Sequence, residues 1–295
     1  MANLITAFSS QQKSISIEAC TVDLPFLRQF YQEMYKATAE AQKIQVSELV
    51  RLESTTPEQF EKFKEEVKSH YVLIIQIWGS RGEYLHSPNI DILNEDQLPN
   101  EVTRIIFDSS LQFVQNFKVE PSHKVKIEFD FSRARVFDLV SPASQPTPNT
   151  SAITVVGTNV TWVSGTYSTI IDLIEGRKRR VNWLHGTNIY DIFLWTSILP
   201  IGFWALAKLD LPNRISWEGI PQVYFVGVNI YLFLFFCLCC RILFNYARWI
   251  FPKHELVYKD RKSSAKHRYI LWAVLGPLIV SFIGDIVRAL YTIIF

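Results

Sequence analysis

The sequence predicts an α+β soluble domain at the N-terminus, followed by an α-helical transmembrane domain of about three spans. Residues 1–188 alternate between strand-like and helix-like hydrophobic periods. Residues 189–295 instead contain long uncharged stretches and many of the aromatic residues. We therefore expect residues 1–180 to form a cytoplasmic α+β domain and residues 181–295 to form a transmembrane helical domain.

The first 70 residues predict one strand and two helices. Ile15 and Ile17 alternate with polar neighbours, as in a half-buried strand. Asp23 can cap a helix that tolerates Pro25 in its first turn, and Thr56 can precede a second helix. The side chains expected to face the core are Leu27, Phe30, Met34, Ala37, Ala41 and Ile44 in the first helix, and Phe60, Phe63 and Val67 in the second.

The next part of the chain predicts a sheet. Residues 71–78 form a continuous apolar run, which is typical of a strand covered on both faces, and residues 102–107 form another strand. Residues 125–131 alternate strictly. This alternation predicts that Val125, Ile127, Phe129 and Phe131 are buried, and that Lys126, Glu128 and Asp130 face water.

A loop, a strand and a helix complete the predicted domain. Residues 140–151 are rich in proline, serine and threonine and indicate a loop, which a strand at 152–156 follows. Asn159 is expected to cap the last helix. The inward face of that helix would hold Val160, Val163, Tyr167, Ile170, Ile171 and Ile174.

Three later stretches are long and apolar enough for a membrane, whose core of about 30 Å needs about 20 apolar residues in a helix. We place the spans at about 190–207, 219–240 and 269–291. Tryptophans near several ends suit the interface between lipid and water. A buried helix of a soluble protein explains one such run but not three.

The distribution of basic residues predicts the orientation. The basic run Arg177, Lys178, Arg179 and Arg180 precedes the first span, and eight lysines and arginines lie within 241–268. The connection after the first span offers only Lys208 and Arg214. The positive-inside rule therefore places the N-terminal domain in the cytoplasm of a multi-pass protein of the inner cell membrane, and residues 209–218 outside. The N-terminus has no features of a secretory signal.

The search for chemistry finds no catalytic motif, so the sequence predicts no enzyme, no cofactor and no metal site. The six histidines are scattered, and three of the four cysteines lie in the apolar run at 237–240, where we expect them to pack. The formal net charge of +2 does not favour nucleic acid. Catalysis by residues distant in sequence stays open as a third functional class.

The third span carries the most informative polar residues. Ser281, Asp285, Arg288 and Thr292 are spaced by four, three and four, so they share one helical face. Ionisable residues within a bilayer are costly and mark functional positions. This stripe could line a polar path or an interface between copies of the chain. The alternative is an ion pair that reaches toward the outer headgroups. The basic run 177–180 would attract anionic headgroups.

Phe251, Pro252, Glu255 and Leu256 form an F-P-x-x-E-L stretch, which a basic run and an apolar tail follow. Over residues 160–295 the chain resembles uncharacterised bacterial membrane-anchored proteins with an N-terminal α+β domain. Some of those proteins resemble membrane effectors of antiphage defence. The resemblance implies a soluble domain that senses a partner, and spans that perturb the membrane.

The leading hypothesis is a homo-oligomeric membrane effector or channel-like protein, whose cytoplasmic domain regulates membrane permeabilisation. The partners are then the lipid bilayer and further copies of the chain. A regulatory protein or a nucleotide or oligonucleotide stays open as the ligand of the cytoplasmic domain. The alternative hypothesis is a membrane-tethered binding or scaffold module whose spans act only as an anchor.

Overall fold

The computed structural model describes residues 10–138, 140–141, 143–209, 221–258 and 262–294. Its contacts divide the chain into two compact units. We call the first the sheet unit (Met1–Ser132, Asn149–Arg180 and Lys253–Asp260) and the second the helical unit (Arg133–Pro148, Val181–Pro252 and Arg261–Phe295). The boundary expected at 180/181 is one place where the chain passes between the units. A single boundary would put the loop 133–148 in the sheet unit and the segment 253–260 in the helical unit. The structure instead places 133–148 in the helical unit and 253–260 in the sheet unit.

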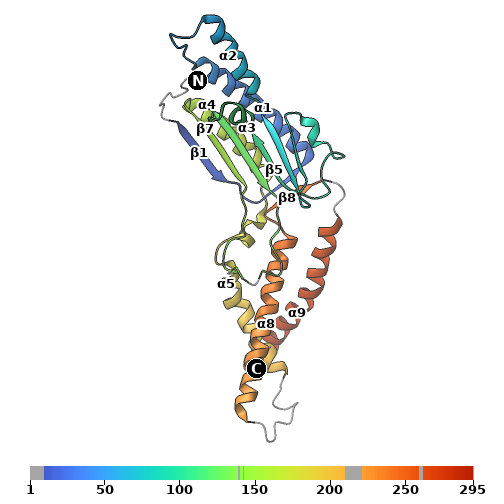
Figure 1. Ribbon diagram of the computed structural model, residues 1–295. Helices are drawn as coiled ribbons and strands as arrows, with labels where there is room; N and C mark the ends of the chain where they lie inside the picture. The colour runs from blue at the N-terminus through green and yellow to red at the C-terminus, as the bar shows by residue number, and fades with distance from the viewer. Residues whose placement is uncertain (1–9, 139, 142, 210–220, 259–261, 295) are drawn as a thin grey trace. The chain divides into compact units, whose positions relative to one another are not determined.

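The sheet unit is an N-terminal α+β unit, as predicted (Figure 1). Its elements are β1 (Gln11–Ser16), β2 (Cys20–Asp23), α1 (Leu24–Ser47), α2 (Pro57–His70), β3 (Ile74–Gly79), β4 (Tyr84–Ser87), the 3-10 turn η1 (Ile90–Leu93), β5 (Val102–Asp108), α3 (Leu111–Phe117), β6 (Lys124–Asp130), β7 (Ala152–Gly157), α4 (Val160–Glu175) and β8 (His254–Val257). The strands form a six-stranded sheet in the order β1-β7-β6-β5-β3-β4, and a separate pair of β2 with β8.

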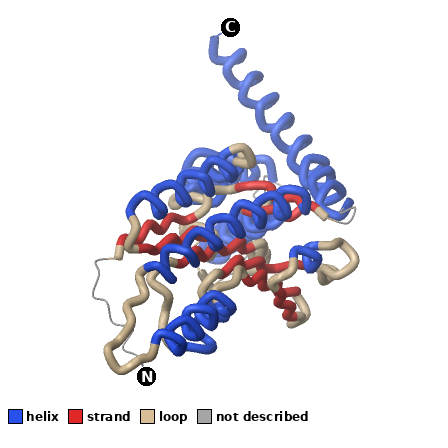
Figure 2. The backbone as a smooth tube through the Cα atoms, turned by 90° about the horizontal axis from the view of Figure 1, so that it is seen from above, coloured by secondary structure: helices blue, strands red, loops and turns tan. Residues whose placement is uncertain are grey.

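The six-stranded sheet is antiparallel throughout, and helices cross its strands on one face (Figure 2). The ring of Phe30 on α1 lies 5.4 Å from the ring of Phe107 on β5 and 5.5 Å from the ring of Phe129 on β6. All three side chains are fully buried. Because aromatic rings at this separation pack favourably and bury large apolar areas, this contact anchors α1 to the centre of the sheet.

The predicted helix starts are confirmed by their caps. The carboxylate of Asp23 accepts the main-chain N–H of Phe26 at 2.8 Å, and Thr56 forms a reciprocal capping box with Gln59. The side chain of Asn159 accepts the N–H of Trp162 at 3.0 Å. These bonds satisfy main-chain donors that the first turn of a helix cannot pair internally.

Three burial predictions were wrong. Ile15 is 44% exposed because β1 is an edge strand, and Val160 is 53% exposed because it lies in the first turn of α4. Asp130, predicted to face water, is only 6% exposed. Strict alternation describes β6 as far as Phe129. At the end of the strand, the position of Asp130 is instead determined by its hydrogen bonds to neighbouring loops.

In the helical unit, the elements are the 3-10 turn η2 (Arg180–His185, whose first residue belongs to the sheet unit), α5 (Ile189–Phe193), the π-helical turn η3 (Leu194–Ile198), α6 (Leu199–Leu209), α8 (Gln222–Ile250) and α9 (Lys262–Ile294). The widened turn η3 ends just before Pro200. A proline removes one helical N–H and crowds the carbonyl four residues earlier, so a local π-turn accommodates it.

Among the described residues, two helical segments are long and apolar enough to cross a membrane: Ile189–Leu209 and Gln222–Ile250. They contain the span predicted at 190–207 and residues 222–240 of the span predicted at 219–240. The second helix runs ten residues beyond the predicted end at Cys240. The segment predicted at 269–291 is helical within α9 but is not one of these two. Apart from Leu209, the loop predicted at 209–218 lies outside the described residues.

Helices α6 and α8 approach each other closely at Gly202. A Cβ atom added to Gly202 would lie 2.8 Å from the ring of Phe233 and 3.1 Å from the ring of Phe236. The neighbouring Phe203 stacks on Phe233 with 5.0 Å between ring centroids. A glycine is therefore required here by the space that two aromatic side chains of α8 occupy.

Candidate functional site

The strand β2 binds two of the segments that connect the sheet unit to the helical unit. It pairs in parallel with β8, the segment that follows α8 in the chain. It also bonds to residues 177–179, which precede the first membrane-length helix: Thr21 N donates to Arg177 O at 3.0 Å, and Arg179 N donates to Ala19 O at 2.7 Å. We call these three segments (19–23, 177–179 and His254–Val257) the β2 seam.

Side chains reinforce the β2 seam. Arg179 pairs with Glu255 of β8 at 3.1 Å, and both side chains are largely buried. Arg177 donates to the carboxylate of Asp23 at 2.8 Å. Three residues of the predicted basic run thus have carboxylate partners inside the sheet unit, since Lys178 also contacts Glu18 at 3.3 Å and Glu175 at 3.1 Å. Arg180 is exposed.

A cysteine and a histidine meet inside the β2 seam. The Sγ atom of Cys20 lies 3.2 Å from Nδ1 of His254, and each residue is 1% exposed. Burial raises the pKa of Cys20 to about 12, against smaller lowering effects of Arg179 and Lys253. A nucleophilic cysteine requires an accessible thiolate, whereas this thiol is neutral and enclosed. The pair therefore packs the β2 seam together.

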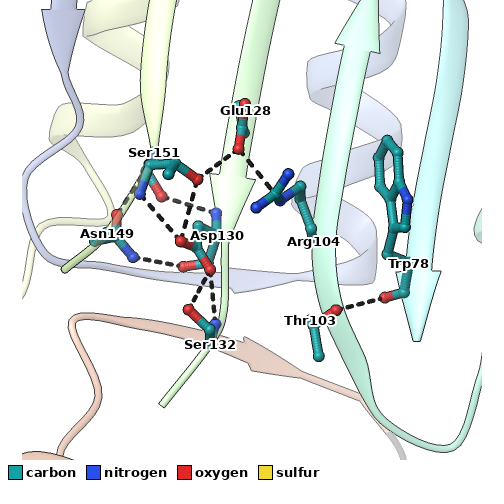
Figure 3. Close-up of polar contacts among 9 residues, drawn as sticks. Trp78, Thr103, Arg104, Glu128, Asp130, Ser132, Asn149 and Ser151 are labelled. Carbon is teal, nitrogen blue, oxygen red and sulfur yellow. Dashed lines mark hydrogen bonds and ion pairs between the residues drawn. The ribbon is translucent and has the colours of Figure 1, made fainter. Parts of the chain in front are cut away.

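Asp130 fastens the two ends of the loop that connects β6 to β7 (Figure 3). Its carboxylate accepts the N–H of Ser132 at 2.9 Å and the N–H of Thr150 at 3.0 Å, and it also accepts both hydroxyl groups. Asn149 donates to the main-chain oxygen of Asp130 at 2.9 Å. We call Asp130, Ser132 and residues 149–151 the Asp130 clip. It lies where the chain leaves the sheet unit and where it returns.

The electrostatics of the Asp130 clip favour the charged carboxylate. Burial alone would raise the pKa of Asp130, but the hydrogen bonds from Ser132 and Thr150 together lower it below its ordinary value. Glu128 accepts from the hydroxyl of Thr150 at 2.5 Å and pairs with Arg104 at 3.2 Å (Figure 3). Hydrogen bonds to an ionised acceptor are stronger than those between neutral groups. The clip is therefore a firm base for the loop.

Within the helical unit, the buried guanidinium of Arg248 on α8 joins two loops. It is 4% exposed and donates to main-chain oxygens at Leu184 (3.0 Å), Ala143 (3.3 Å), Gln145 (3.1 Å) and Gly186 (3.4 Å). Burial of a charge is costly unless hydrogen bonds replace its water. Arg248 meets this requirement only while both loops stay against α8.

Two further residues on the same face of α8 extend this arrangement. Arg241 donates to the main-chain oxygens of Asp138 (3.2 Å) and Ser141 (2.5 Å), and Asn245 donates to that of Asp138 at 3.4 Å. His185 contacts the main-chain oxygen of Phe251 at 2.7 Å. We call Arg241, Asn245 and Arg248, with the loop carbonyls that they bind, the α8 collar. The loop 133–148 therefore links the Asp130 clip to the α8 collar through the chain itself.

The predicted stripe on α9 is only partly brought together. Asp285 accepts from Nε1 of Trp204 at 3.0 Å, contacts Nζ of Lys208 at 3.0 Å, and lies 4.0 Å from Arg288. Asp285 thus joins α9 to the end of α6, a contact that the sequence did not indicate. Ser281 is exposed and the side chain of Arg288 is 85% exposed, while the side chain of Thr292 lies outside the described residues.

The sheet unit also has a groove of about 410 Å³ between α1 and α4. Its lining includes Glu33, Lys36, Glu40, Trp162 and Gly165, so it mixes charged, aromatic and small side chains. The indole nitrogen of Trp162 donates to the main-chain oxygen of Ala37 at 3.2 Å and fixes the floor.

A buried histidine lies at the start of β6. His123 is fully buried, and its Nε2 atom accepts the N–H of Asn159 at 3.2 Å. Its Nδ1 atom lies 3.8 Å from the carboxylate of Glu48. Burial lowers the pKa of His123, and the charge of Glu48 offsets this only in part. The imidazole is therefore neutral when the sheet unit is folded at neutral pH.

Sequence reasoning missed the Asp130 clip, strand β8 and the α8 collar. A signal for the collar was present: Arg241, Asn245 and Arg248 are spaced by four and three, the same pattern that singled out the stripe on α9. The Asp130 clip had a weaker signal. Asp130 lies two residues before Ser132, and the polar run Asn-Thr-Ser at 149–151 comes directly before the next strand. Strand β8 has only four residues, and their sequence shows no pattern that predicts a strand.

The described residues contain no group of three or more histidine, cysteine, aspartate or glutamate side chains that could hold a metal ion. The side chains of the Asp130 clip and the α8 collar are engaged with one another or with main-chain atoms. Compared with protein-family models, curated proteins and solved structures, the chain matches none of them.

Proposed function

We propose that this chain is an oligomeric membrane effector of channel-like type, in which the sheet unit faces the cytoplasm of a bacterial cell and controls permeabilisation of the inner membrane by the helices. The β2 seam is the observation that carries the proposal. A single strand binds the segment that precedes the first membrane-length helix and the segment that follows the second. A shift of β2 would therefore pull on both helices at once.

The other connection supports the same proposal. Within the described residues the chain passes between its units at 132/133, 148/149, 180/181 and 252/253. An anchor needs one such connection. Here the Asp130 clip fixes the base of the loop 133–148, and the α8 collar fixes its remainder to a membrane-length helix. Several chain connections between the two units suit a domain that controls helices.

The proposal includes α9 as a third span. Asp285 would lie in it beside Trp204 and Lys208 of α6, and an ionisable residue at membrane depth faces protein or water. We propose that Ser281, Asp285, Arg288 and Thr292 line a polar path or an interface when copies of the chain assemble. The resemblance to antiphage effectors makes loss of the membrane barrier the activity to measure.

Permeabilisation is tested by induced expression of the full chain in bacteria, with uptake of a membrane-impermeant dye and viability as readouts. We expect uptake with the native chain, and a clear reduction in the variants Asp285→Ala and Arg288→Ala. Asp172→Ala, which removes an exposed carboxylate of α4, is the control and should leave uptake unchanged. Equal uptake in all four proteins would argue strongly against the proposal.

Coupling is tested by reversing one ion pair of the β2 seam. Arg179→Glu places two carboxylates together at the position where Arg179 and Glu255 lie 3.1 Å apart, so we expect altered dye uptake. The double variant Arg179→Glu with Glu255→Arg restores opposite charges and should recover the native response. A chain whose residues 190–250 and 262–295 are replaced by unrelated membrane spans, with 251–261 kept because β8 belongs to the sheet unit, addresses the scaffold alternative. Full activity of that chain would establish a scaffold rather than an effector.

A further inference from the structure

An apolar pocket of about 350 Å³ lies beside the last turns of α8, on the face that does not carry the α8 collar. It is formed within the helical unit by α8, by the start of α9 and by the loop that follows β6. Its lining consists of Val136, Phe137, Ile242, Leu243, Tyr246, Trp249 and His267. Among the described residues no carboxylate lines it, and Phe137 is 77% exposed. Apolar surface left open in this way marks a binding site for an apolar group.

A cationic group lies next to the pocket. The guanidinium of Arg133 lies over the ring of Trp249 at 4.8 Å. His267 is itself part of the lining and contacts the hydroxyl of Tyr246 at 2.7 Å. Asp138 follows Phe137 in the chain, and its carboxylate accepts the N–H groups of Val140 and Ser141. An occupant with an apolar part and a negative part matches this arrangement.

We propose that this pocket binds one anionic phospholipid, with an acyl chain against Leu243 and Trp249 and the phosphate near Arg133. The proposal rests on the membrane location included in the proposed function. Under that orientation the pocket lies at the cytoplasmic end of the second span, where basic residues near spans bind acidic headgroups. Tryptophan and tyrosine are also suited to this depth, because each combines an apolar ring with a polar atom.

The bound lipid would act on the α8 collar. Val136 and Phe137 line the pocket, and the next residue, Asp138, supplies the main-chain oxygen that Arg241 and Asn245 bind. Occupation of the pocket therefore holds residues 136–138 against α8 and keeps the loop 133–148 in its collar position. The conformation of the helices would then depend on how much anionic lipid the inner leaflet contains.

The test uses the full chain purified in mild detergent and titrated with phosphatidylglycerol or with phosphatidylcholine of the same acyl chains. Native mass spectrometry counts the retained lipids. We expect one retained phosphatidylglycerol per chain and at least tenfold weaker retention of phosphatidylcholine. Leu243→Trp fills the pocket and should abolish retention, and Arg133→Gln should remove the preference for the anionic lipid. The controls are Leu234→Trp, at an exposed position of α8, and Arg135→Gln, at an exposed position of the same loop.

Equal retention by Leu243→Trp and Leu234→Trp, or equal retention of the two lipids by the native chain, would overturn the lipid site. Circular dichroism and gel filtration of each variant identify a misfolded protein, and Arg133→Gln, which changes no buried apolar group, then decides alone. Cell fractionation separates this failure from that of the proposed function. A chain recovered in the soluble fraction defeats the membrane proposal, whereas a membrane-bound chain without anionic lipid defeats only the pocket.

Discussion

Arg248 of α8 donates through Nη1 to the main-chain oxygen of Gln145 at 3.1 Å, although 103 residues separate them in the chain. The same guanidinium binds Leu184 O at 3.0 Å, in the segment that precedes the first membrane-length helix. One buried side chain therefore holds two loops to one helix. This relationship explains why an arginine, with donors pointing in several directions, occupies a buried position.

Arg248→Gln should destabilise the helical unit. Glutamine is too short to reach both loops, so several buried carbonyls lose their partners, and each one left unsatisfied costs about 1–3 kcal/mol. We expect a lower melting temperature in detergent and faster protease cleavage within residues 133–148. Arg180→Gln, at an exposed arginine, is the matched control and should change neither quantity. Unchanged cleavage in Arg248→Gln would show that the collar does not hold the loop.

Asp130→Asn should loosen the Asp130 clip. An amide oxygen replaces one carboxylate oxygen and the amide nitrogen cannot accept, so the donors of Ser132 or Thr150 lose a charged partner. We expect a loss of about 1–3 kcal/mol in the free energy of unfolding, measured by denaturant titration. Asp172→Asn, at an exposed position of α4, is the control. Its free energy of unfolding should change by less than about 0.5 kcal/mol, as is usual for surface substitutions.

The same carboxylate predicts an acid dependence. Because the pKa of Asp130 is lower in the folded chain than its ordinary value of 3.8, its stabilising contribution is complete above that value. The contribution is lost as the pH falls through the lower, folded pKa. Unfolding free energies measured from pH 6 down to pH 2 should therefore fall more steeply in the native chain than in Asp130→Asn. Parallel curves would contradict this assignment.

His123 predicts a second pH dependence at milder acidity. Since burial lowers its pKa in the folded chain, the stabilising effect of the neutral imidazole is complete above the ordinary value of 6.5. It decreases as the pH falls below 6.5 toward the lower folded pKa. The melting temperature should thus fall as the pH is lowered from about 7.5 to about 5.5, one unit either side of the ordinary histidine value. His123→Gln, which can still accept the N–H of Asn159, should flatten this part of the curve, and His86→Gln on an exposed strand should not.

Gly202→Leu should disturb the packing of α6 on α8. Since even a Cβ atom would meet Phe233 at 2.8 Å, a larger side chain forces the helices apart at a cost of about 1–3 kcal/mol. A lower melting temperature in detergent measures this effect. Gly227→Leu on α8 is the control, because a Cβ atom there meets nothing within 4 Å. Equal melting temperatures in the two variants would contradict a close helix contact at Gly202.

Much of the sheet unit could be predicted because its signals are local. The caps at Asp23, Thr56 and Asn159 use a side chain and a main-chain N–H three residues apart, so each was readable from a few residues. The candidate site was harder to predict from the sequence. The α8 collar had a spacing signal, but its acceptors are main-chain oxygens of loops, and any residue type supplies such an oxygen.

The sequence by itself determined β1, α1, α2, β3, β5, β6, β7 and α4 of the sheet unit and the two membrane-length helices, because hydrophobic period and length are properties of consecutive residues. The short elements β2, β4, α3 and β8 were not predicted. Only the tertiary structure decided that β8 pairs with β2, that Asp130 is buried, and that Arg179 binds Glu255 rather than facing outward. The reason is physical: these contacts join residues as far as 234 positions apart, as Cys20 and His254 are. The energy of each contact depends on which chain segments the fold brings together, and a pattern of consecutive residues does not contain that information.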